Sequence, residues 1–286
     1  MRKLLKSINF KKGIRTFLIA YIGLVAVLFL MQRSLLYYPF GAYQSPQEIG
    51  LQDTQELRLP TPDGQQALAW FSPPPEDSSG RVAVFFHGNG GGLKQNSFLL
   101  TMLQQAQLGF LAVEYRGYPG YEGKTTEENI YNDARAGMAF LEAQGYTPDK
   151  LILLGQSLGS GVAVQMATEY EVGLVALISP YTTIADAAAH IYWYLPVQWL
   201  VLDRFDSYDK IRDVTAPVYI FHGTEDTLVP FALGQRLYDH AAAQKRFFAL
   251  DGQDHNRLEF ERIIREIAAF TGAEKVTEIP ESEEQD

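Results

Sequence analysis

Apolar positions fall into two alternating patterns between about residues 55 and 270. Short, continuous apolar runs begin near residues 82, 110, 151, 174, 218 and 247, and a pair of strand-like segments at 55–59 and 66–71 precedes them. Between the runs lie stretches with helical spacing, at about residues 94–108, 126–144, 158–170, 234–243 and 256–270. Continuous apolar runs that alternate with helices are typical of parallel strands buried on both faces. The pattern therefore predicts an α/β fold, with a mostly parallel sheet and helices on both faces.

The N-terminal region has a different pattern, an uninterrupted apolar run over residues 17–31. A spanning helix needs about 20 residues, but apolar character resumes at 35–38 with aromatic residues suited to a membrane interface. No small-x-small cleavage pattern follows Met31. We therefore expect a basic N-terminal segment at 1–15 and a signal-anchor transmembrane segment at 16–38. A cleaved signal peptide and a buried or peripheral amphipathic helix remain as alternatives.

Charge is distributed unevenly around this run. Residues 1–33 carry seven basic and no acidic residues, and the rest of the chain carries 17 of the 24 basic residues and all 34 acidic ones. Because basic residues concentrate before the run, the positive-inside rule places the N-terminus in the cytoplasm. The domain expected at 41–272 would then lie outside the cytoplasm, in the periplasm if the source is bacterial. The acidic segment 273–286 is expected to be disordered.

The strongest motif is Gly155-Gln156-Ser157-Leu158-Gly159, which follows a strand-like run and opens a helical stretch. Glycines around a serine let the backbone turn sharply, so that the hydroxyl projects from a strand-to-helix turn. Ser157 is the candidate nucleophile. A glycine-rich helix start packed closely on the sheet is the alternative.

A serine nucleophile needs a histidine base and a carboxylate that orients it. Of the five histidines, only His255 follows the last strand-like run, as the chain order Ser, acid, His requires. Asp226, after the preceding run, is the favoured acid. His222 as base, and Glu225 or Asp254 as acid, remain as alternatives.

Acyl transfer also needs N–H donors for the developing oxyanion. The N–H of Leu158 follows the nucleophile, and the segment His87-Gly88-Asn89-Gly90 follows an apolar run. We expect the backbone N–H groups of Leu158 and Asn89 to form the oxyanion hole, with Gly90 in reserve. The segment lacks the P-loop Lys-Ser/Thr pair and the G-x-G-x-x-G spacing, which argues against nucleotide binding.

Residues 181–214 interrupt the strand and helix alternation and are rich in large apolar side chains. We expect a small helical cap whose aromatic residues line a substrate pocket, namely Tyr181, Trp193, Tyr194 and Trp199. Packing of these side chains onto the body is the alternative. Arg116, at a strand end, is expected to brace neighbouring loops, with contact to an anionic substrate group as the alternative.

Composition excludes several classes of site. The chain has no cysteine, which excludes disulfides, thiol catalysis and thiolate metal ligands, and it has no HExxH-type metal motif. Its net charge of −10 argues against nucleic acid as a partner. We therefore expect no metal, and the sequence indicates no oligomeric state.

In this order, the motifs resemble those of the alpha/beta-hydrolases, and in particular the N-terminally anchored, single-pass alpha/beta-hydrolase domain-containing proteins. The likeness covers about residues 35–270 and rests on Thr61-Pro62-Asp63-Gly64, His87-Gly88-Asn89-Gly90, Tyr115-Arg116-Gly117-Tyr118, the turn at Ser157, Ser179-Pro180-Tyr181, residues 222–226 with Val229-Pro230, and residues 252–256.

The resemblance implies the alpha/beta-hydrolase fold and a serine hydrolase without cofactor, which acts on carboxylic esters, thioesters or acylglycerol-like lipids through an acyl-enzyme. An acyltransferase, a peptidase and a non-catalytic binding scaffold remain as alternatives. Because the predicted catalytic residues all follow residue 33, we expect that a chain without residues 1–33 still hydrolyses soluble esters.

Overall fold

The computed structural model describes residues 2–270, with side chains from residue 10 onward. Its centre is an eight-stranded sheet in the order β10-β9-β8-β7-β4-β6-β3-β2. The two pairings that involve β3 are antiparallel and the others are parallel, so the prediction of a mostly parallel sheet is confirmed. The strands are β2 (Gln55–Pro60), β3 (Gln66–Ser72), β4 (Val82–Phe86), β6 (Gly109–Val113), β7 (Leu151–Gln156), β8 (Leu174–Ile178), β9 (Val218–Gly223) and β10 (Lys245–Leu250).

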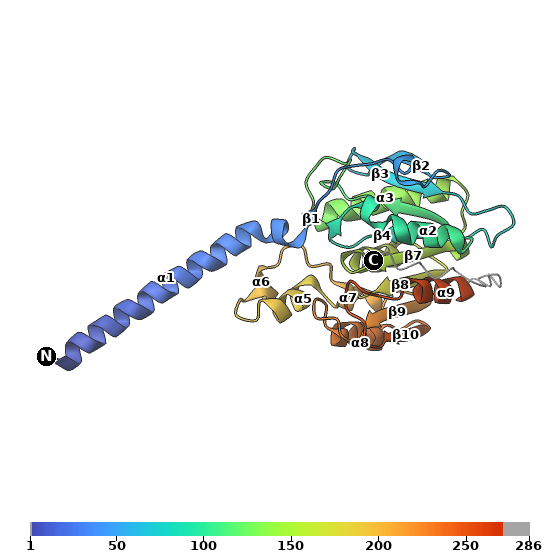
Figure 1. The fold of residues 1–286 in the computed structure, drawn as a ribbon. Helices are drawn as coiled ribbons and strands as arrows, with labels where there is room; N and C mark the ends of the chain where they lie inside the picture. The colour runs from blue at the N-terminus through green and yellow to red at the C-terminus, as the bar shows by residue number, and fades with distance from the viewer. Residues whose placement is uncertain (1, 271–286) are drawn as a thin grey trace, which may run out of the picture.

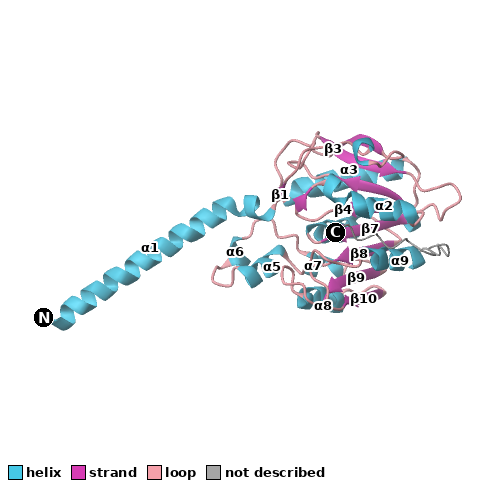
Figure 2. Cartoon of the chain, viewed as in Figure 1, coloured by secondary structure: helices cyan, strands magenta, loops and turns pink. Residues whose placement is uncertain are grey.

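Helices cover both faces of the sheet (Figure 1, Figure 2). On one face α2 (Ser97–Gln105) contacts α9 (Phe260–Phe270). On the other face α3 (Glu127–Ala143) contacts α4 (Leu158–Glu169), and α8 (Phe231–His240) packs on β9 and β10. Strands such as β4 and β8 are buried along their whole length. This burial explains why they appear in the sequence as continuous apolar runs.

Two helices begin later than their periodicity predicts. Residues Leu93–Asn96 form a 3-10 turn, η2, before α2. Before α9, the Asp254 carboxylate accepts the N–H groups of Asn256 and Arg257, and the Gln253 side chain accepts the N–H of Glu259. These contacts hold the chain in a turn up to Phe260, because side chains that accept nearby backbone N–H groups offer the chain an alternative to helical hydrogen bonds.

The first helix, α1 (Arg2–Leu36), projects from the body (Figure 1). It runs without a break across the boundary expected at residue 15. Its segment Phe10–Leu36 is long and apolar enough to cross a membrane, with 27 residues and a mean hydropathy of 2.3 in its most apolar part. After α1, β1 (Tyr38–Pro39) pairs in parallel with β5 (Gly90–Gly91), which ties the end of α1 to the loop after β4.

The expected cap contains three short helices, α5 (Ile184–Ile191), α6 (Val197–Leu200) and α7 (Ser207–Ile211). The Thr183 and Asp206 side chains cap the N-termini of α5 and α7. α7 packs against α4 and α8, so this end of the cap rests on the body of the domain. Two more 3-10 turns, η1 (Gln47–Ile49) and η3 (Pro148–Lys150), lie in loops. The acidic segment 273–286 lies outside the described residues.

Candidate active site

Ser157 lies in the sharp turn between β7 and α4. Its φ of 50° and ψ of −116° are rare for a residue with a side chain and cost about 1–3 kcal/mol. Its N–H donates to the Ile178 carbonyl at 2.8 Å, which holds the turn on the neighbouring strand. Gly159 lies so close to the Phe86 carbonyl that a side chain there would clash. The glycine after the serine is therefore required by the packing of α4 on β4.

Ser157, His255 and Asp226 form a continuous hydrogen-bonded chain. Ser157 Oγ lies 3.0 Å from His255 Nε2, and His255 Nδ1 lies 2.7 Å from Asp226 Oδ2. The three residues follow β7, β10 and β9, and the carboxyl ends of these parallel strands meet at one edge of the sheet. With a proton on Nδ1, His255 donates to the carboxylate and accepts from the serine hydroxyl. A general base needs this tautomer.

Asp226 is buried and fully engaged. Its Oδ1 accepts the N–H groups of Leu228 and Val229, at 3.0 and 2.8 Å. Burial alone would raise the pKa of this carboxyl. Hydrogen bonds with His222 and His255, attraction to His255 and the Val229 N–H outweigh the burial and hold the pKa well below its ordinary value. Asp226 is thus a carboxylate that can orient His255 and stabilise its positive charge.

The alternative bases and acids have other contacts. His222 is fully buried, with Nε2 at 2.9 Å from the Val229 carbonyl and 3.4 Å from Asp226 Oδ2. Its ring supports the acid rather than the nucleophile, since no hydrogen bond joins it to Ser157 in the part of the chain that the structure describes. Asp254 accepts from the backbone of its own loop, and Glu225 is exposed.

The two expected oxyanion donors flank the nucleophile. Leu158 is the first residue of α4, so its N–H has no acceptor within the helix. Asn89 belongs to the loop between β4 and β5, where its carbonyl accepts from the Tyr38 N–H and the Tyr118 hydroxyl. Its side chain donates to the Leu36 carbonyl at the end of α1. These contacts hold Asn89 in place, and Asn89 and Ser157 line the same pocket.

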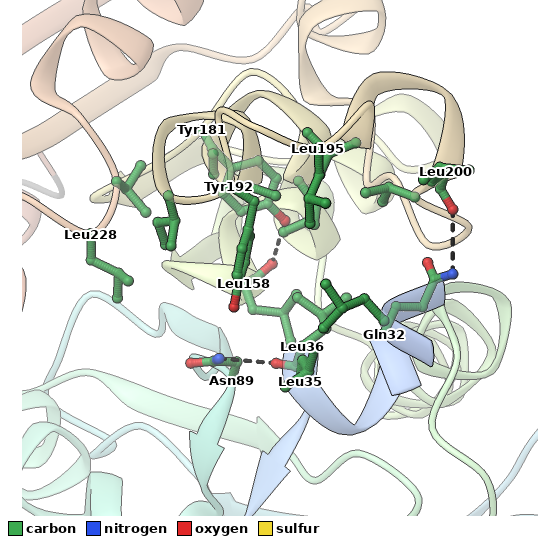
Figure 3. Close-up of a pocket in the computed structure, with 18 of the residues that line it drawn as sticks. Gln32, Leu35, Leu36, Asn89, Leu158, Tyr181, Tyr192, Leu195, Leu200 and Leu228 are labelled. Atoms are coloured by element: carbon green, nitrogen blue, oxygen red, sulfur yellow. Dashed lines mark hydrogen bonds between the residues drawn. The ribbon is translucent and has the colours of Figure 1, made fainter. Parts of the chain in front are cut away.

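A cavity of about 240 Å³ opens at Ser157 (Figure 3). Tyr181, Tyr192, Leu195 and Leu200 of the cap form one wall. The opposite wall comes from α1, through Val25, Leu28, Phe29, Gln32, Leu35 and Leu36. Within residues 10–270, no group of three or more His, Asp or Glu side chains could hold a metal ion. The site thus places a serine, linked by hydrogen bonds to a histidine and a carboxylate, in the lining of a mainly apolar cavity.

Comparison with known proteins assigns the family. The chain matches the family described as alpha/beta hydrolase of unknown function (DUF1057) over residues 73–200. It is 32% identical to the uncharacterized protein Rv2307c of Mycobacterium tuberculosis over 235 residues, which cover 82% of this chain and 84% of that protein. It is 31% identical to alpha/beta hydrolase domain-containing protein 17B of Homo sapiens, over 68% of this chain and 67% of that protein. The chain belongs to the alpha/beta-hydrolase superfamily.

Solved structures share the fold of this hydrolase. The Pyrococcus furiosus esterase Pf2001 superposes with a TM-score of 0.67 at 18% identity, over 82% of this chain and 98% of that chain. A Paleococcus ferrophilus monoacylglycerol lipase superposes with a TM-score of 0.55 at 20% identity, over 72% of this chain and 99% of that chain. At these identities the likeness concerns the fold alone.

The cap aromatics of the hydrolase are placed differently from the expectation. Tyr181 lines the cavity, and its hydroxyl donates to the Leu158 carbonyl at 3.0 Å. Trp193 and Trp199, expected in the pocket, are 81% and 87% exposed, and neither they nor Tyr194 belong to the cavity lining. The prediction that these three residues line the pocket is therefore wrong. Trp193 and Tyr194 lie in the turn between α5 and α6, and Trp199 lies in the four-residue helix α6, so no helical periodicity indicates which of these side chains face the body.

Arg116 braces loops of the hydrolase, as expected. It is buried, and its guanidinium donates to Asp63 at 2.6 Å and to Asp133 at 2.7 Å. The hydrogen bond from Arg116 lowers the pKa of Asp63 from its ordinary value of 3.8 to about 2, against a small opposing effect of burial. Arg116 therefore connects the Asp63 turn and α3, and its charge is already balanced by two carboxylates.

Sequence reasoning missed two groups of residues around the site. Glu114 is buried, lies 2.8 Å from His87 Nε2 and accepts the Leu93 N–H, so it supports the loop that carries Asn89. A charged residue directly after an apolar run was the signal that could have revealed it. The second group is the α1 wall of the cavity. Its residues Val25 and Leu28 fall within 1–33, so a chain without that segment would lose part of its pocket.

Proposed function

We propose that this hydrolase is a serine hydrolase that cleaves carboxylic esters, thioesters or acylglycerol-like lipids. The observation that carries the proposal is the hydrogen-bonded chain from Ser157 through His255 to Asp226, with Ser157 in the lining of a mainly apolar cavity. An esterase and a monoacylglycerol lipase are among the proteins of similar fold, which is consistent with the proposal.

In the proposed reaction, Ser157 Oγ attacks the substrate carbonyl carbon while His255 Nε2 takes the hydroxyl proton. The N–H groups of Leu158 and Asn89 donate to the oxyanion, and Asp226 stabilises the imidazolium. His255 then gives its proton to the leaving alkoxide or thiolate, which leaves an acyl-enzyme on Ser157. A water molecule then attacks the acyl carbon while His255 takes its proton. Release of the carboxylic acid returns the proton to Ser157 Oγ and restores the serine.

The same residues would serve an acyltransferase, in which another acceptor replaces water, or a peptidase, in which the leaving group is an amine. A binding scaffold would keep the fold without turnover. The apolar walls favour an acyl-bearing substrate over a polar peptide. Hydrolysis is the simpler reaction for these three residues, because it needs no acceptor other than water. Product analysis separates hydrolysis from acyl transfer.

The test is to label the full-length protein with a fluorophosphonate probe and to measure turnover of p-nitrophenyl esters, with thioester and amide analogues. We expect labelling that disappears in Ser157→Ala, and turnover of esters and thioesters that exceeds turnover of amides. Absence of both labelling and turnover would favour a binding scaffold. Faster turnover of amides would favour a peptidase.

We further propose that α1 is retained as a membrane anchor, with the N-terminus in the cytoplasm and the catalytic domain on the other side. Support comes from the apolar segment Phe10–Leu36 and from the basic residues concentrated before residue 16. The small-molecule or lipid ester substrate would then be met outside the cytoplasm, in the periplasm of a bacterium.

A further inference from the structure

One face of α1 packs along the cap. The half-buried positions of its apolar part recur at intervals of three or four residues, which places them on one side of a helix: Tyr21, Val25, Leu28, Gln32 and Leu36. Hydrogen bonds fix this packing at both ends. The Tyr21 hydroxyl donates to the Tyr194 carbonyl at 2.8 Å, and the Gln32 side chain exchanges hydrogen bonds with the backbone of Leu200 and Leu202.

The contact between α1 and the cap is too long for the cap to remain outside a membrane that α1 spans. The cap contacts α1 from residue 21 onward, so only residues 10–20 of the candidate span lie beyond it. At about 1.5 Å per residue these cover about 16 Å, roughly half of a hydrocarbon core of about 30 Å. Lys11, Lys12 and Arg15 lie in that part, which shortens its apolar length further. If α1 spans the bilayer, the cap must enter the outer leaflet beside it.

The exposed side chains of the cap suit that environment. Trp193 and Trp199 are almost fully exposed, each next to a residue whose carbonyl accepts from α1. Ile191, Tyr194 and Leu202 are also exposed on the cap. Large apolar side chains gathered on one surface mark an interaction site, and tryptophan favours the membrane interface. Their position along α1 identifies the lipid bilayer as the partner of this surface.

The catalytic cavity lies between the same two elements. Val25 and Leu28 of α1 line it together with Leu195 and Leu200 of the cap, and Ser157 belongs to the same lining. An acyl chain that left the bilayer between α1 and the cap would meet apolar walls on both sides. Its ester carbonyl would reach Ser157 without passing through water, which would spare the acyl chain the free-energy cost of exposing its methylene groups to water.

We infer that the substrate is a membrane-resident lipid ester, and that the anchor helix and the cap together form its acyl-chain site, opening into the outer leaflet. This inference rests on the proposed serine hydrolase function. It gives α1 a role in selectivity as well as attachment.

The first test uses two valines of α1 in the full-length protein, reconstituted in phosphatidylcholine vesicles. Val25 lines the cavity, and Val27 is 52% exposed on the outer side of α1. In Val25→Trp we expect the ratio of kcat/KM for a dodecanoyl ester over an acetyl ester to fall about tenfold or more, because the indole fills the acyl site. Val27→Trp should keep the wild-type ratio. Leu28→Trp, with the exposed Leu30 as its control position, repeats the comparison in case Val25→Trp does not fold.

Each outcome has a distinct meaning. A ratio that is equal in the variants and their controls, while the wild type hydrolyses esters through Ser157, would overturn the acyl-chain site and leave the proposed function intact. If the wild type hydrolyses no ester and Ser157→Ala behaves identically, the proposed function itself fails.

The second test uses the three tryptophans of the chain. Trp70 is buried in the sheet, at 1% exposure, and serves as an internal reference for Trp193 and Trp199. In vesicles of brominated phosphatidylcholine we expect the tryptophan fluorescence of the wild type to be quenched. We expect this quenching to disappear in the double variant Trp193→Phe, Trp199→Phe. Equal fractional quenching of the wild type and the double variant would show that the cap does not enter the bilayer.

Discussion

Three side chains carry the proposed chemistry, and their geometry makes them interdependent. His255 connects Ser157 to Asp226 through both ring nitrogens, so loss of either neighbour changes its orientation or its protonation. Buried His222 adds a second support by contacting the same oxygen of Asp226. At the scale of single residues, the site is therefore a coupled unit, and the losses of activity on removing each side chain should not be additive.

We predict that Ser157→Ala and His255→Ala each reduce ester hydrolysis about a thousandfold or more, and that the double variant is little worse than either single variant. Asp226→Asn should lose less, since the oxyanion donors and the cavity remain. The measurement is kcat/KM for one soluble ester in all four variants. Additive losses in the double variant, or most activity retained in Ser157→Ala, would contradict the proposal that Ser157, His255 and Asp226 act together as a catalytic triad.

The junction between α1 and the cap is the element on which the pocket depends. Arg33 donates through Nε and Nη2 to the two oxygens of Asp203, at 2.7 and 3.0 Å, and the Tyr37 hydroxyl donates to the same carboxylate. Asp203 is buried, so its charge depends on these partners. This ion pair therefore joins the two elements that form opposite walls of the cavity.

Asp203→Asn should therefore lower the free energy of unfolding by about 1–3 kcal/mol, since the amide cannot accept the paired guanidinium donors and leaves Arg33 without its counter-charge. Thermal unfolding of the full-length protein in detergent measures the loss. Asp213→Asn is the control, because its ion pair with Arg212 is exposed and long, at 3.9 Å. Equal melting temperatures for the two variants would show that the junction contributes nothing to stability.

At the scale of the whole molecule, charge and hydropathy are separated along the chain. The basic N-terminal segment, the apolar helix and the acidic hydrolase domain follow one another in order. Such an order favours a basic end retained in the cytoplasm and an acidic domain on the opposite side. If α1 spans the bilayer, the contacts between the cap and α1 hold the catalytic domain close to it.

The absence of native cysteine allows a direct test of this orientation. In intact cells, we predict that Ser282→Cys reacts with a membrane-impermeant maleimide and that Ser7→Cys does not, because only the C-terminal side is outside the cytoplasm. Both positions should react once the membrane is permeabilised, which serves as the control. The reverse pattern would place the hydrolase domain in the cytoplasm.

Sequence alone was sufficient for the parts of this protein that local patterns encode. Central strands of the sheet, such as β4 and β8, follow from apolar runs, because burial on both faces leaves no polar positions in them. The order of Ser157, Asp226 and His255 follows from the strands they succeed, because the carboxyl ends of parallel strands meet at one edge. The hydrogen bonds of the structure join the residues that this order predicted.

Only the tertiary structure decided what forms the pocket. Val25 and Leu28 lie more than a hundred residues before Ser157, and nothing in the periodicity of an apolar helix marks the side that faces the cap. Trp193 and Trp199 were wrongly expected in the pocket for a similar reason, since neither a turn nor a four-residue helix has a periodicity that indicates its buried side. Local sequence determines which residues form each element, but packing between distant elements decides which side chains meet.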